Sequence, residues 1–221
     1  MAKSSTARRL DEPPAELAQK RPGFGGGEPP APPVSPNVPV GSNAWVAMLM
    51  FLGAEAMFFA GLIGAYIVFR VGAPVWPPPF QPRLPVGVTG VNTFILLASA
   101  VTMRWSMRAV RANKQRELAR FLACTAALGG TFLAIQGFEW LRLLRFGLTV
   151  SSSVYGGLFY TLIGFHGAHV LGALIWLLAV FAVAKQGRFS QQRHVGLQTC
   201  AMYWTFVVGL WPVLYGLVYL Y

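Results

Sequence analysis

Five apolar runs dominate the sequence, and each is long enough to cross a lipid bilayer. Spanning the hydrocarbon core takes about 20 predominantly apolar residues of helix, because the backbone polar groups must be satisfied within the segment. Only 11% of the residues are charged, against about 25% in a typical soluble domain. The sequence therefore predicts an all-α polytopic membrane protein, a bundle of five transmembrane helices at about 44–69, 86–107, 118–141, 155–184 and 198–221.

The distribution of lysine and arginine predicts how this bundle is oriented. Fourteen of the 18 basic residues lie in the first forty residues and in the loops after the second and fourth runs. Basic loops stay on the cytoplasmic side, so the N-terminus is predicted to be cytoplasmic and the C-terminus outside. Residues 1–40, rich in Pro and Gly over 22–39, are predicted to be a disordered tail before a membrane domain at 41–221. Because the charges flank apolar runs, the net charge of +11 does not indicate a nucleic-acid partner.

One carboxylate, Glu55, lies inside the first apolar run, about eleven residues from either end. At 1.5 Å of rise per residue, its distance of roughly 16 Å from the helix ends is too great for its side chain to reach water. An ionised carboxylate in hydrocarbon costs at least ~2.5–3.5 kcal/mol. Glu55 is therefore expected to be protonated, paired, or turned toward protein.

A second pair of polar residues lies near the outer end of the third run. Gln136 and Glu139 are three residues apart and share one helix face. Two interpretations are open for Glu139: an ion pair with Arg142 or water at the membrane surface, or a bond to a polar group on the fourth run that holds two helices in register.

The fourth run contains two histidines, His166 and His169, close to the middle of the membrane. A haem would normally take ligands from two helices, and no second predicted helix carries a histidine. Hydrogen bonds across the bundle are therefore the favoured interpretation of both side chains.

The cysteines, Cys124 and Cys200, lie in different predicted helices without a metal-ligand spacing, and both are expected to be small buried residues. The sequence also lacks a nucleophile–base pair, a phosphate-binding glycine loop and a cluster of carboxylates. We therefore predict no catalytic residues and no metal site. The residues alone leave three classes of protein open: a proton-handling protein, a carrier or an accessory subunit.

Five segments, taken in order, resemble subunit III of the haem–copper cytochrome oxidases, in the shorter bacterial form without the first two of seven helices. They lie within residues 51–59, 92–99, 136–140, 155–170 and 194–215. The last helix departs from the family pattern, which commonly has Glu, His and Asp at Gln198, Thr205 and Val208. A subunit III-like component of a quinol oxidase or nitric oxide reductase therefore stays open. The alternative outside the oxidase and reductase complexes is a proton-coupled carrier that functions without partner subunits.

The resemblance implies a non-catalytic, metal-free subunit of a terminal cytochrome c oxidase in the bacterial inner (plasma) membrane. Its expected partners are oxidase subunits I and II, which would carry the haem and copper, together with bound phospholipid and a larger respiratory supercomplex. It implies support of proton uptake and of the stability of the oxygen-reducing centre. Glu55 would be the family's buried, carbodiimide-reactive carboxyl, either proton-active or structural. The remaining site residues would form polar contacts between helices: Asn92, Gln136, Glu139, His166 and His169.

Overall fold

The computed structural model describes residues 40–78, 84–190 and 194–220, which belong to one compact unit, Val38–Tyr221. The tail predicted for residues 1–40 lies outside the described residues, except for its last residue, which begins the first helix.

All regular structure in the described part of the chain is helical, and five of the helices are long and apolar enough to cross a membrane. This confirms the predicted all-helical fold. The helices run past the predicted spans at most ends, because helical geometry continues into the polar flanks. Their bounds are α1 Val40–Gly72, α2 Val86–Arg111, α3 Gln115–Arg145, α4 Val154–Lys185 and α5 Val195–Tyr215, the last continuing as a π-helical turn, η1 Gly216–Leu220.

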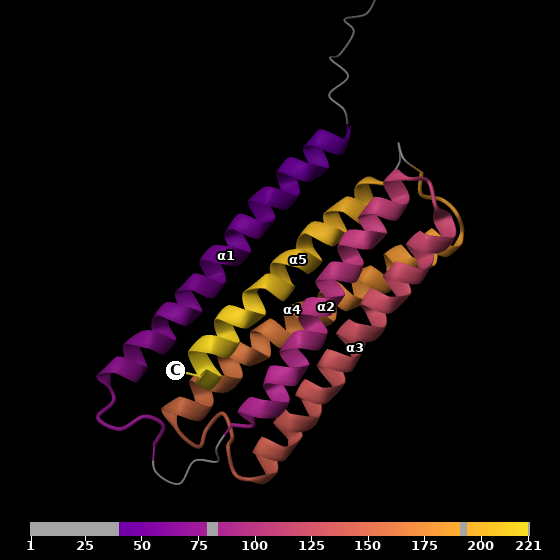
Figure 1. The fold of residues 1–221 in the computed structure, drawn as a ribbon. Coiled ribbons are helices and arrows are strands. Elements are labelled where there is room, and N and C mark those ends of the chain that lie inside the picture. Colours follow the sequence, from indigo (N-terminus) through magenta and orange to yellow (C-terminus); the bar gives the residue numbers. More distant parts are fainter. Residues whose placement is uncertain (1–39, 79–83, 191–193, 221) are drawn as a thin grey trace, which may run out of the picture. The chain divides into compact units, whose positions relative to one another are not determined.

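Helices α2 to α5 form a closed arrangement in which α2 packs on α3, α3 on α4, α4 on α5, and α5 back on α2 (Figure 1). Helix α1 lies outside this group and packs on α4 and α5. Only 11% of the most apolar stretch of α1 is buried. The first helix therefore presents most of its apolar surface to whatever surrounds the protein.

Three of the helices, α2, α3 and α4, are followed by a residue in the left-handed conformation. Asn113 after α2, Gly147 after α3 and Gly187 after α4 all have positive φ, at 55°, 88° and 68°. Gly and Asn tolerate this conformation, which closes the last helical turn. At the start of α4, the Ser153 hydroxyl accepts a hydrogen bond from the backbone N–H of Gly156 at 3.1 Å, a typical N-cap.

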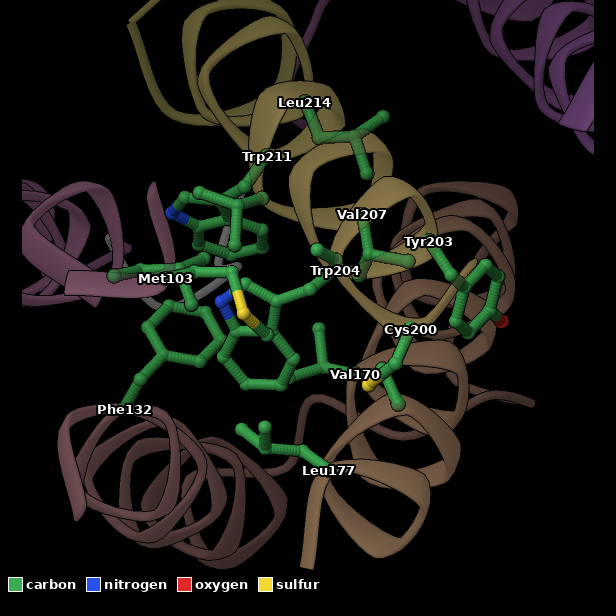
Figure 2. Packing of buried hydrophobic residues seen from close by; sticks show 14 of the residues in the cluster. Met103, Phe132, Val170, Leu177, Cys200, Tyr203, Trp204, Val207, Trp211 and Leu214 are labelled. Atoms are coloured by element: carbon green, nitrogen blue, oxygen red, sulfur yellow. The ribbon is translucent and has the colours of Figure 1, made fainter. Parts of the chain in front are cut away.

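The core of the bundle is built around the large aromatic side chains of α5. Figure 2 shows Trp204 and Trp211 reaching between the helices toward Met103 of α2 and Phe132 of α3. Lipid is as apolar as these side chains, so close packing rather than escape from water holds membrane helices together. Gly129 of α3 makes this packing possible, since a Cβ there would collide with the Trp204 ring.

Candidate functional site

The most polar contact inside the bundle joins α1 to α4. Nε2 of His169 lies 2.8 Å from Oε2 of Glu55, and only 20% and 17% of the two side chains are exposed. Glu55 is therefore paired and turned toward protein, as the cost of an ionised carboxylate in hydrocarbon predicts. The partner is His169, not His166, although both histidines lie on the same helix.

Aromatic rings of α1 enclose this pair. The Phe59 ring meets the His169 imidazole edge-on at 5.1 Å, and the Phe58 ring stacks on it at 6.2 Å. Both phenylalanines follow Glu55 by about one helical turn, so they lie on the same side of α1. The rings limit access of water, which strengthens the electrostatic interaction between carboxyl and imidazole.

The second ring nitrogen fixes the tautomer of His169. Nδ1 lies 2.6 Å from the backbone carbonyl oxygen of Phe165. A carbonyl oxygen only accepts hydrogen bonds, so Nδ1 is the donor and carries a proton. Nε2 is therefore the nitrogen that faces Oε2 of Glu55, in a close contact that lacks the geometry of a regular hydrogen bond.

His166 lies one turn away and has different surroundings. Its side chain is fully buried and stacks on the Trp211 ring at 5.0 Å with an interplanar angle of 24°. Neither ring nitrogen has a hydrogen-bond partner within the residues that the structure describes. His169 thus makes a close polar contact across the bundle with Glu55, whereas His166 makes an aromatic contact.

The other predicted polar residues hold neighbouring helices together or pair locally. The Asn92 amide donates to the Phe132 carbonyl oxygen at 3.1 Å, which ties α2 to α3. The Gln136 amide donates to the Tyr219 hydroxyl at 3.1 Å, which ties α3 to the end of the chain. Glu139 pairs with Arg142 on its own helix at 3.1 Å, so the local interpretation of this acid holds in the structure.

Hydroxyl groups of α2 make contacts that the sequence analysis missed. The indole N–H of Trp211 donates to Thr93 Oγ1 at 2.8 Å, and that of Trp204 to Ser99 Oγ at 3.1 Å. One turn further along α2, the hydroxyls of Thr102 and Thr125 lie 2.7 Å apart. The sequence contains a pattern that could have predicted these contacts, because Ser and Thr recur on one face of α2 at helical spacing.

Two further expectations concern single residues. Cys200 is buried as predicted, but Cys124 is exposed, so the prediction is wrong for that residue, which faces away from the bundle. In the divergent part of α5, Val208 is buried and Thr205 bonds the Ala201 carbonyl of its own helix at 2.8 Å. No group of three or more His, Cys, Asp or Glu side chains converges in the described part of the chain.

Fold and site together define a helical membrane protein with a partly buried acid–imidazole pair between α1 and α4 and a set of polar contacts between helices. The sequence profile of the family described as cytochrome c oxidase subunit III matches residues 36–221. The chain therefore belongs to the cytochrome c oxidase subunit III family.

Individual relatives agree with this assignment. Cytochrome c oxidase subunit 3 of Synechocystis sp. is 39% identical over 78% of this chain and 73% of its own length. The protein of the same name from Thermostichus vulcanus is 32% identical over 79% of this chain and 86% of its own. A probable cytochrome c oxidase subunit 3 of Nocardia farcinica is 35% identical over the same shares.

Proposed function

We propose that this chain is a metal-free accessory subunit of a terminal cytochrome c oxidase, the complex that passes electrons to dioxygen and translocates protons. Membership of the subunit III family supports the assignment to an oxidase. In this proposal the haem and copper reside in subunits I and II, and the chain lies in the bacterial inner membrane with its N-terminus in the cytoplasm. The chain contributes no catalytic centre of its own.

The Glu55–His169 pair is the observation that carries the functional part of the proposal. This pair brings a carboxyl and an imidazole, two groups that can each bind a proton, within 2.8 Å of each other at membrane depth. Such a pair supports proton uptake by the complex and keeps the first helix attached to the bundle. Both roles act on oxygen reduction indirectly, through the supply of protons and the stability of the neighbouring catalytic subunit.

The surface of α1 supports the proposed partners. Met50, Met57 and Val68 are 73%, 79% and 70% exposed, although all three lie in a membrane-length apolar helix. An apolar surface of this size is a contact surface for protein or lipid. We assign it to subunit I and to bound phospholipid acyl chains.

Substitution of the buried carboxyl tests the proton-related role. Glu55→Gln keeps the size and the hydrogen-bonding capacity of the side chain but removes the titratable proton. We expect the assembled oxidase to keep its haem and copper content while proton uptake slows and activity declines over repeated turnovers. Glu117→Gln is the matched control, because Glu117 is a half-exposed carboxylate paired with Lys114 at the start of α3. Equal proton uptake in both variants and the unsubstituted complex would refute the role of Glu55.

Removal of the whole chain tests its place in the complex separately. Detergent extraction of this subunit is expected to leave haem and copper spectra, normalised to the remaining complex, nearly unchanged. Loss of one stoichiometric haem or copper together with this chain would overturn the metal-free assignment.

A further inference from the structure

A cavity of about 400 Å³ lies between α3 and α4, and neither Glu55 nor His169 lines it. Its floor is formed by Phe132, His166 and Trp211, and small residues such as Gly164 leave space along α4. Leu171, which also lines the cavity, is 51% exposed. The cavity therefore opens to the outside of the bundle at membrane depth, and its volume falls in the range of small-molecule sites.

Several polar atoms without a partner come from the side chains that line this cavity. Oε1 of Gln136, Nε1 of Trp140 and both ring nitrogens of His166 are buried and have no hydrogen-bond partner within the described residues. Gln136 and His166 are themselves 3% and 1% exposed. Leaving such atoms unpaired costs free energy, so each one in a native structure calls for a partner.

The chemistry of these atoms defines the partner. The amide oxygen accepts a hydrogen bond, the indole N–H donates one, and a neutral imidazole does both. No lysine, arginine or carboxylate is among the lining residues. A ligand with a hydroxyl or carbonyl group satisfies these atoms, whereas a phosphate or ammonium group would enter without a counter-charge. The rest of the lining is apolar and suits a hydrocarbon body.

We propose that this cavity binds an uncharged amphiphile, a hydrocarbon or isoprenoid molecule whose hydroxyl or carbonyl oxygen lies among Gln136, Trp140 and His166. The ligand enters from the membrane, because the mouth opens beside Leu171 and not toward water. This site is distinct from the apolar surface of α1, where charged headgroups can stay at the membrane surface.

Photolabelling of the intact oxidase in its membrane tests the proposal. The probe is a hexadecanol analogue with a photoreactive diazirine near the hydroxyl, and labelled residues are identified by mass spectrometry. We expect labelling at the lining of α3 and α4. Unlabelled hexadecanol should compete about fivefold better than hexadecane, the factor that one net hydrogen bond provides. Hexadecyl phosphate should compete no better than hexadecane.

Two glycines of α4 provide a matched pair of variants. A Cβ at Gly164 or at Gly172 meets nothing within 4 Å, so a side chain can start at either position without a clash, but of the two only Gly164 lines the cavity. Gly164→Leu is expected to reduce labelling about tenfold, and Gly172→Leu to leave it unchanged. In His166→Phe, which keeps a ring against Trp211 and removes both nitrogens, the preference for alcohol over alkane should fall at least twofold.

Several results would overturn the assignment. Equal competition by hexadecane would show a groove for plain acyl chains. Strongest competition by hexadecyl phosphate would indicate a phospholipid site, and equal labelling of the two leucine variants would place the probe elsewhere. Absence of label on α3 and α4 would show that the cavity takes no amphiphile of this class.

Discussion

Adding one methyl group at Gly129 should loosen the bundle, although the same change at the next residue should not. A Cβ at Gly129 would lie 2.8 Å from Cζ2 of Trp204 and still closer to Cη2, whereas a Cβ at Gly130 meets nothing within 4 Å. The indole cannot move aside freely, because Trp204 is fully buried and its N–H donates to Ser99 at 3.1 Å. Gly129→Ala must therefore displace the ring or separate α3 from α5.

The magnitude follows from three contributions. Overpacking of a close-packed core costs about 1–3 kcal/mol. Loss of the Trp204–Ser99 hydrogen bond adds about 0.6 kcal/mol, the average for bonds between membrane helices. Replacing Gly by Ala in a helix gains up to about 1 kcal/mol at either position. We therefore expect Gly129→Ala to be less stable than Gly130→Ala by about 2–4 kcal/mol.

Unfolding of the purified chain in mild-detergent micelles, titrated with a denaturing detergent and followed by circular dichroism, measures this difference. The comparison between adjacent glycines cancels helix propensity and leaves only the contact with the indole. Stabilities of the two alanine variants within about 0.5 kcal/mol, a typical effect of a substitution away from special features, would show that Trp204 does not occupy this position in the membrane.

Three further predictions follow from the polar contacts. A hydrophobic carbodiimide, which reacts with protonated carboxyls, should label Glu55, and His169→Phe should increase the labelling because no imidazole then lies beside the carboxyl to take up its proton. Reduced labelling in that variant would show that His169 does not compete for this proton. A double-mutant cycle of Gln136→Leu and Tyr219→Phe, measured by the same unfolding titration, should give a coupling free energy of about 0.6 kcal/mol and at most about 1.7 kcal/mol. Zero coupling would contradict the 3.1 Å contact between the two side chains. Glu139→Gln should lower the free energy of unfolding by less than about 1 kcal/mol, because its partner Arg142 is half exposed, and should leave turnover per assembled complex unchanged. Abolished turnover in an intact complex would show that Glu139 does more than pair with Arg142.

The candidate site shows where sequence reasoning about side-chain contacts succeeds and where it stops. The position of Glu55 inside an apolar run was enough to predict that the carboxyl is protonated, paired or turned toward protein. It did not decide between the histidines at 166 and 169, because they differ only by one turn of the same helix. The structure separates them: His169 faces α1 and binds Glu55, whereas His166 turns toward Trp211 of α5.

The sequence by itself determined the number and the character of the helices. Transfer of a segment into hydrocarbon depends on the side chains of that segment alone, so apolar runs predict membrane helices without knowledge of their neighbours. The tertiary structure decided which faces meet. Each residue turns the helix by about 100°, so a small rotation or shift replaces one contact by another. The hydrogen bonds from Trp204 and Trp211 to α2, and the cavity beside His166, therefore exist only once all the helices have taken their places.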